Sequence, residues 1–156
     1  MVGSLPGERI QKAGTTRDEE TVKQRGLTEK IIGAFYAVYN ELGYGFAEKV
    51  YEKALLIELR QLGLRAEQQV PIAVFFRGET VGEFYADIVV EDGVVLELKA
   101  AKKLMPEHEA QLLSYLKSTE YEVGLLLNFG PKAEVKRKIF DNHRKGSLSW
   151  TRKAKP

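Results

Sequence analysis

The stretch V94-V-L-E-L-K-A100 decides the fold, because it places two charged residues inside a run that otherwise reads as a buried strand. Five of its seven residues are aliphatic, which is typical of a strand in a protein core. Burying a charge is costly unless the charge is paired or binds a metal. Glu97 and Lys99 are two residues apart, so a strand directs both to the same face of a sheet. That face is therefore either in contact with water or part of a site.

The segments around this stretch predict the remaining elements. Three antiparallel strands joined by hairpins are expected over residues 65–76, 80–90 and 94–99. Two helices, each closed by a glycine, are expected before them over residues 27–43 and 46–63. A helix opened by Pro106 follows over residues 106–118, then a buried strand over 121–129, then a strand or short helix. This order predicts an α/β (α+β) protein with a mixed central β-sheet flanked by helices.

Length and composition exclude several classes of protein. A chain of 156 residues is sufficient for one domain, and 44% hydrophobic with 29% charged residues is an ordinary soluble composition. No apolar run approaches the roughly 18 residues of a membrane span, and the N-terminus lacks a secretory signal, so we expect no membrane contact and a cytoplasmic location. The absence of cysteine excludes disulfides, thiolate nucleophiles and cysteine-bound zinc.

Charge divides the chain into a central domain and two ends. Residues 1–25 are polar, and we predict a flexible N-terminal arm there. Residues 26–140 form the predicted folded domain, and residues 141–156 a basic C-terminal tail. From residue 132 to the end, nine Lys or Arg face two Asp or Glu, which gives +7 and leaves −5 for the rest. Such a segment either attracts a polyanion or is a solvated tail that keeps the protein soluble.

The hairpin before Val94 allows its register to be calculated. If residues 91–93 form a three-residue loop with Gly93 in the left-handed conformation, Val90 pairs with Val94 and Asp87 faces Glu97. With a two-residue loop, Glu97 would instead turn to the other face of the sheet. Like charges directly opposite each other are destabilising, so the first register favours a cation between the two carboxylates.

Two carboxylates beside a lysine suit a particular chemistry. Mg²⁺ and Mn²⁺ accept few protein ligands and keep much of their hydration. Such an ion, with Lys99 beside it, would activate water against a phosphodiester and stabilise the charge that develops. The Glu-x-Lys triplet alone is not specific, since it recurs at E134-V-K136. The alternative is a salt bridge on a solvated face.

The helix after this strand carries a polar stripe. His108, Gln111 and Tyr115 are spaced by three and four residues, so they share one face of the helix. The stripe either faces a site at the strand ends or consists of scattered surface residues.

Taken together, these residues resemble the PD-(D/E)XK nuclease superfamily, through Asp87, then E97-L-K99, then Q111-L-L-S-Y115. Ala86 stands where the superfamily name has Pro. The segment G45-F-A-E-K-V-Y51 matches Gly-x-x-Glu-x-x-Tyr and, with residues 110–117 and 123–130, resembles the GxxExxY protein family. The resemblance covers residues 27–140.

The resemblance implies a restriction-endonuclease-like fold with the core order α-β-β-β-α-β, in which residues 26–140 are the nuclease-like domain. It implies a Mg²⁺- or Mn²⁺-dependent nuclease with DNA as its partner. Asp87, Glu97 and the main-chain carbonyl of Leu98 would be metal ligands, and Lys99 the catalytic lysine together with the two acids.

Further residues receive roles from the same resemblance. Glu48 would hold a second metal or a bound water, although an acid in the first turn of a helix also interacts favourably with the helix dipole. The expected substrate-binding residues are Gln111, Tyr115, His108 and Tyr51. Two other functions stay open: a non-catalytic nucleic-acid-binding module of the same fold, and a protein-interaction subunit. The sequence does not distinguish DNA from RNA, or a monomer from a homodimer.

Overall fold

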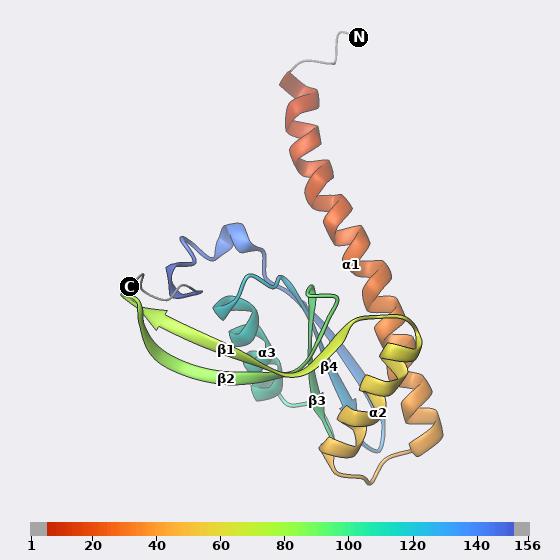
Figure 1. Cartoon of the computed structure of the whole chain (residues 1–156). Coiled ribbons are helices and arrows are strands. Elements are labelled where there is room, and N and C mark those ends of the chain that lie inside the picture. Colours follow the sequence, from red (N-terminus) through yellow and green to blue (C-terminus); the bar gives the residue numbers. More distant parts are fainter. Residues whose placement is uncertain (1–5, 152–156) are drawn as a thin grey trace.

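The computed structural model in Figure 1 is built around a five-stranded mixed sheet. It describes the backbone of residues 6–151 and the side chains of residues 24–151. The helices are α1 (Pro6–Leu42), α2 (Glu48–Gln61) and α3 (Pro106–Ser118). The strands are β1 (Ala66–Phe76), β2 (Glu79–Val90), β3 (Val94–Lys99), β4 (Val123–Phe129) and β5 (Ala133–Ile139). No helix in the described part of the chain combines the length and apolar character needed to cross a membrane.

The strands lie in the order β1-β2-β3-β4-β5, and each pairs with its neighbour. All pairs are antiparallel except β3 with β4, which are parallel and are joined through α3. β3 is therefore a central strand between β2 and β4, and β4 is buried along its whole length. This position explains the aliphatic run around Glu97, because a strand covered on both faces must be apolar.

Helices cover both faces of the sheet (Figure 1). α1 and α2 pack on one face, where Phe35 lies edge-on to Phe129 with ring centroids 4.7 Å apart. α3 packs on the other face through Leu112 and Leu116, which are both fully buried against β3 and β4. The α+β fold with a mixed central sheet and the order of its elements are thus confirmed, and the segment after Pro131 is a strand.

The N-terminal helix is longer than the sequence analysis expected. It begins at Pro6, whereas the apolar period placed its start at Leu27, so the backbone of residues 6–25 is helical where an arm was expected. The reason is local propensity: these residues are rich in Glu, Lys, Arg and Gln, which favour helix without an apolar stripe, and a proline is favourable in the first turn. Residues 1–5 lie outside the described part.

The C-terminal segment is docked on the domain as far as it is described. It forms two short 3₁₀ turns, Asn142–Arg144 and Ser149–Thr151. Lys145 is only 1% exposed, and its Nζ donates to the carbonyls of Thr119 (3.0 Å) and Tyr121 (2.7 Å). Burial lowers the pKa of Lys145 to about 8. Residues 141–151 of the predicted basic C-terminal tail are therefore folded against the domain, and residues 152–156 lie outside the described part.

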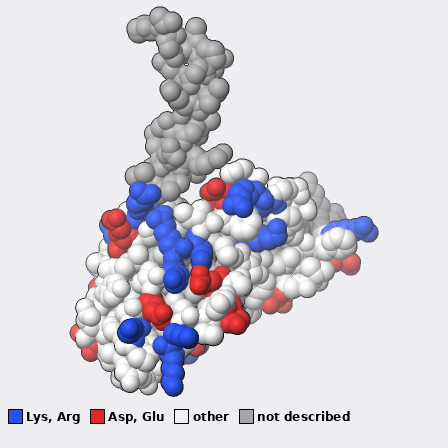
Figure 2. Space-filling view, turned by 180° about the vertical axis from the view of Figure 1, so that it is seen from behind, with Lys and Arg blue, Asp and Glu red and all other residues white. Residues whose placement is uncertain are grey.

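Part of the positive charge near the C-terminus is compensated by a nearby acid. Lys138 on β5 forms an ion pair with Glu109 on α3. On the face shown in Figure 2, Lys and Arg side chains are interspersed with Asp and Glu over the described surface. On that face the described residues do not form a continuous basic patch.

The β2–β3 hairpin has the register calculated from a three-residue loop. Val90 pairs with Val94 and Ile88 with Leu96. The loop conformation differs from the expected one, because the left-handed residues are Glu91 (φ 52°) and Asp92 (φ 48°) and not Gly93. Two successive left-handed residues match the twist of the flanking strands, and Glu91 is held there because its N–H donates to the carbonyl of Arg65 (2.8 Å).

A close backbone approach after β4 gives a test of the packing. A Cβ added at Gly130 would overlap the carbonyl oxygen of Ala101, whereas a Cβ at Gly33 of α1 meets nothing within 4 Å. Gly130→Ala should lower the free energy of unfolding by about 1–3 kcal/mol through overpacking. Gly33→Ala should raise it by about 0.5–1 kcal/mol through helix propensity. Urea denaturation of both variants measures this, and equal effects at the two glycines would contradict the packing described.

Candidate active site

The strands β2 and β3 separate at the position of Asp87 and Glu97. Their pairing ends at Ile88 and Leu96, one step before these two acids. Beyond that point the Asp87 side chain replaces a backbone partner: the Leu98 N–H donates to its Oδ2 (2.8 Å), and the Asp87 N–H donates to Oε1 of Glu97 (3.3 Å). The two carboxylates therefore lie next to each other in the opening between the strands, as the register predicted.

Both acids are held in a setting that opposes their ionisation. Glu97 is 3% exposed, and burial raises its pKa to about 8, with repulsion from Asp87 as the second cause. The pKa of Asp87 is also raised, mainly by burial and further by Glu52 and Glu48, while the hydrogen bond from Leu98 opposes the increase. In the described part of the chain no Lys or Arg forms an ion pair with either carboxylate. Lys99 lowers both pKa values, but not enough to cancel the effect of burial.

Helix α2 adds two acids to this region. Glu48 lies exposed in its first turn and raises the pKa of both Asp87 and Glu97. Glu52 is 4% exposed, and its carboxylate accepts from Lys49 (3.3 Å), Gln68 (2.8 Å) and Gln69 (3.0 Å). Glu48, the glutamate of the Gly-x-x-Glu-x-x-Tyr segment, is therefore the exposed acid of the two, and Glu52 is the buried one.

Gln69 links Glu52 to the carboxylate pair, and sequence reasoning missed it. Its Nε2 donates to Glu52 and reaches Oδ1 of Asp87 at 3.5 Å. Its φ of 52° is left-handed, which is uncommon for a residue other than glycine and costs roughly 1–3 kcal/mol. In the sequence, only the two neighbouring glutamines within a largely apolar strand could have indicated this role. They suggest no function until the fold brings Asp87 beside Gln69.

Lys99 connects the opening to helix α3. Its Nζ donates to Oε1 of Gln111 (3.3 Å), and the Gln111 amide donates to the hydroxyl of Tyr115 (2.9 Å). The Tyr115 ring stacks on Phe84 with centroids 4.8 Å apart, and burial together with the charge of Glu97 raises the pKa of its hydroxyl to about 12. The structure therefore brings Gln111 and Tyr115 to Lys99 in one hydrogen-bonded chain.

The other two residues expected to bind substrate have structural contacts instead. Nδ1 of His108 accepts from the N–H of Met105 (3.0 Å), which caps the first turn of α3. Tyr51 is fully buried, stacks on Phe129 at 4.3 Å, and donates from its hydroxyl to the carbonyl of Gly43 (2.7 Å). Substrate contact by Tyr51 would require its burial and this hydrogen bond to be lost, so we assign it to packing.

The donor set at the opening fits a divalent metal with few protein ligands. A residue in an extended strand points its N–H and its carbonyl to the same edge, so the Leu98 carbonyl lies on the side where its N–H meets Asp87. The described residues contain no group of three or more Asp, Glu, His or Cys able to hold a metal. Two carboxylates and one carbonyl would leave the other positions to water and substrate, as Mg²⁺ and Mn²⁺ prefer. Glu48 is not one of these three ligands, and its binding of a second metal stays a prediction.

Two other features of the sequence and surface have different roles. Glu134 of the second Glu-x-Lys triplet accepts from the Asn128 amide (2.8 Å) and the Leu104 N–H (3.0 Å), so it fixes the loop after β3.

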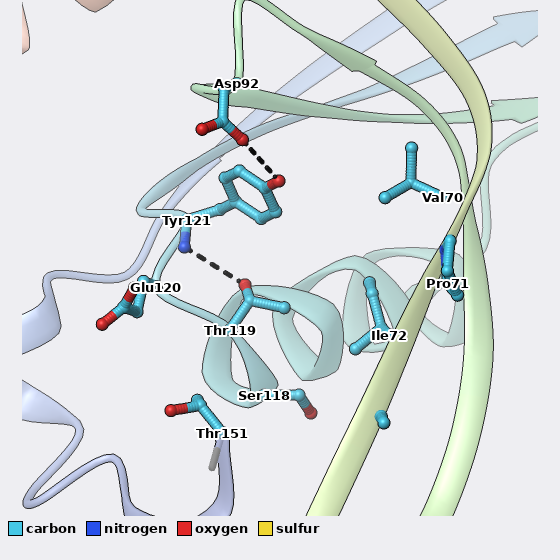
Figure 3. A pocket seen from close by; sticks show the side chains of 10 residues that line it. Val70, Pro71, Ile72, Asp92, Ser118, Thr119, Glu120, Tyr121 and Thr151 are labelled. Carbon is cyan, nitrogen blue, oxygen red and sulfur yellow. Dashed lines mark hydrogen bonds between the residues drawn. The ribbon is translucent and has the colours of Figure 1, made fainter. Parts of the chain in front are cut away.

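A hollow of about 470 Å³ lies between β1 and the end of α3, where the Tyr121 hydroxyl donates to Asp92 at 2.9 Å (Figure 3). Both charged residues that line it, Asp92 and Glu120, are acidic, so it does not suit a phosphate.

Comparison with known proteins agrees with this geometry. The family model of the PD-(D/E)XK nuclease superfamily matches residues 25–138. The chain belongs to this superfamily. Its fold is accordingly restriction-endonuclease-like, and the opening between β2 and β3 carries the Asp and the Glu-x-Lys after which the superfamily is named. No protein of curated function matches the sequence.

Two solved structures are similar to this PD-(D/E)XK protein. One is Hjc of Archaeoglobus fulgidus, a Holliday junction resolvase from an archaeal hyperthermophile. It is 24% identical, the match covers 57% of this chain and 72% of that one, and the TM-score is 0.36. The other is SSO0001, with 16% identity, coverage of 90% and 67%, and a TM-score of 0.41.

The raised pKa of Glu97 predicts how stability depends on pH. The folded protein keeps a proton on Glu97 that the unfolded chain releases, so between pH 4.5 and about 8 the free energy of unfolding falls as pH rises. Glu97→Gln removes this dependence and should make the metal-free protein several degrees more stable than wild type at pH 9, with little difference at pH 4.5.

Thermal denaturation in EDTA at the two pH values measures the effect, with Glu83→Gln on the exposed part of β2 as the control. A Glu97→Gln protein that is less stable than wild type at pH 9 would show that the carboxylate is not repelled in the folded state.

Proposed function

We propose that this protein is a Mg²⁺- or Mn²⁺-dependent nuclease that hydrolyses phosphodiester bonds of DNA. The observation that carries the proposal is the adjacent pair of half-buried Asp87 and buried Glu97, both with raised pKa values, beside Lys99 in a member of a nuclease superfamily. A protein keeps such a pair at a cost in stability, and a bound cation would offset that cost. The family match over residues 25–138 supports residues 26–140 as the catalytic domain.

Each residue at the opening has a role in this proposal. Asp87, Glu97 and the Leu98 carbonyl would hold the metal. When bound, the metal supplies a more acidic water and neutralises charge on the phosphate. Lys99, oriented by Gln111, places its ammonium where negative charge develops on the phosphate during attack.

The remaining polar groups support these residues. On α3, the Tyr115 hydroxyl accepts a hydrogen bond from the Gln111 amide and so orients Gln111. Gln69, anchored by Glu52, restrains one oxygen of Asp87 on the opposite side. Tyr115 and Gln69 are positioning residues, because Tyr115 acts on substrate through Gln111 and Lys99, and Gln69 acts through Asp87.

Cleavage assays test the proposal directly. The purified chain is incubated with linear, circular and single-stranded DNA and with RNA, in Mg²⁺ and in Mn²⁺. Cleavage is expected with metal and not with EDTA. Asp87→Asn and Lys99→Met should each lower its rate by about 10²-fold or more, because each removes charge stabilisation at the reacting phosphate. Lys30→Met, a change at an exposed lysine on α1, should leave the rate unchanged.

The outcomes of this assay separate two functions. Retention of nucleic acid without cleavage in either metal would support a non-catalytic binding module. Cleavage that survives both substitutions would place the catalytic centre elsewhere.

The state of Glu97 predicts a proton release on metal binding. Because its pKa is about 8 in the metal-free protein, Glu97 is largely protonated at pH 7 and must lose that proton to bind a cation. Calorimetric titration with Mn²⁺ in two buffers of different ionisation enthalpy should report about one proton released at pH 7, and affinity should rise toward pH 9. Glu97→Gln should release none. Equal heats in both buffers for wild type would contradict the assignment of Glu97 as a ligand.

A further inference from the structure

A second hollow lies at the ends of β3 and β4, next to the carboxylate opening. It has a volume of about 270 Å³. Its walls come from the α1–α2 loop (Tyr44, Gly45 and Phe46), from the residues after β3 (Ala100, Ala101 and Lys102) and from the residues around the end of β4 (Phe129, Gly130 and Pro131). None of the proposed metal ligands lines it, so it is a separate feature of the surface.

Two of these walls continue directly into the proposed active site. Ala100 follows Lys99, the last residue of β3. Phe46 precedes Glu48 by two residues, and Glu48 is near enough to raise the pKa of Glu97. A nucleic-acid strand with a phosphate at the opening would therefore place a neighbouring nucleotide at this hollow.

The side chains at the hollow combine aromatic rings with positive charge. Tyr44 is 62% exposed and Phe46 47% exposed, although both are large and largely apolar. Single exposed aromatic residues are common, but two beside one hollow are the arrangement that stacks nucleobases. Lys102 and Lys103 follow on the same loop and are both exposed, as suits contact with the phosphates on either side of a base.

The hollow is also rigid. The buried amide of Asn128 holds Ala101 from both sides, accepting from its N–H (2.9 Å) and donating to its carbonyl (3.0 Å). Tyr39 donates to the carbonyls of Gly130 (2.7 Å) and Pro131 (2.9 Å). On the opposite wall Phe46 lies edge-on to buried Tyr51 at 6.0 Å. Because these backbone walls are hydrogen-bonded before binding, little of their main chain must be ordered when a planar group enters.

We propose that this hollow binds an unpaired nucleobase of the strand being cut, with Tyr44 and Phe46 as the stacking residues. The inference rests on the proposed function and narrows its substrate class. A base inside a continuous duplex is stacked and paired, so it reaches the hollow only after extrusion, which costs a few kcal/mol. Substrates with an unpaired base near the cut, namely single strands, flaps and branch points, are therefore favoured over continuous duplex.

Binding of 2-aminopurine oligonucleotides tests this without cleavage. The full-length protein is titrated in Ca²⁺ with a single strand and with a duplex that carry the fluorescent base. Wild type should quench the base in the single strand. Tyr44→Ala should weaken single-strand binding by about 5- to 150-fold, the loss of one base–aromatic stack, and abolish most of the quenching. Duplex affinity should change less than twofold.

Three further variants make the result specific. Tyr44→Trp should restore binding because it keeps a stacking surface, and Tyr44→Leu should not because it keeps only apolar volume. Tyr36→Ala, at a tyrosine exposed on α1, is the matched control and should behave as wild type. Since Tyr44 is exposed, all Tyr44 variants should melt like wild type.

The outcomes distinguish this inference from the proposed nuclease. Tyr44-dependent quenching without cleavage on any substrate would support the base site and overturn the nuclease. Metal-dependent cleavage with unchanged single-strand binding by Tyr44→Ala would overturn the base site and leave the nuclease standing. No binding of either oligonucleotide by wild type would overturn the base site.

Discussion

The placement of buried Glu97 beside half-buried Asp87 in one opening of the sheet is the constraint around which this structure is arranged. Asp87 and Glu97 face each other where β2 and β3 separate, and burial together with their mutual charge keeps the pKa of Glu97 near 8. A central strand buried on both faces fixes Glu97 there, and the hydrogen bond from Leu98 fixes Asp87. The sheet therefore keeps Glu97 largely protonated at pH 7 in the metal-free protein, and a bound cation would stabilise its ionised form.

The opening between β2 and β3 could be predicted from the sequence because strand pairing follows a period of two residues and is fixed by the length of the loop. The period of two, the short loop at residues 91–93 and the like charges of Asp87 and Glu97 were sufficient to predict the register, although the left-handed residues of the loop were misassigned. The stripe of Gln111 and Tyr115 followed from helical spacing in the same way.

Contacts between distant segments could not be predicted from local patterns. Gln69 carries no signal until β1 is placed beside Asp87 and Glu52. Lys145 belongs to the segment predicted as a basic C-terminal tail, and only the fold reveals the two carbonyls to which it donates.

The central claim is that the carboxylate pair is a metal site, and a crystal of the full-length protein soaked in Mn²⁺ at pH 8.5 tests it most directly. We expect one anomalous peak between the carboxylates of Asp87 and Glu97, within ligand distance of the Leu98 carbonyl, and no such peak in an Asp87→Asn crystal. An empty opening in the wild-type crystal, with Lys99 turned inward to neutralise the acids, would contradict it.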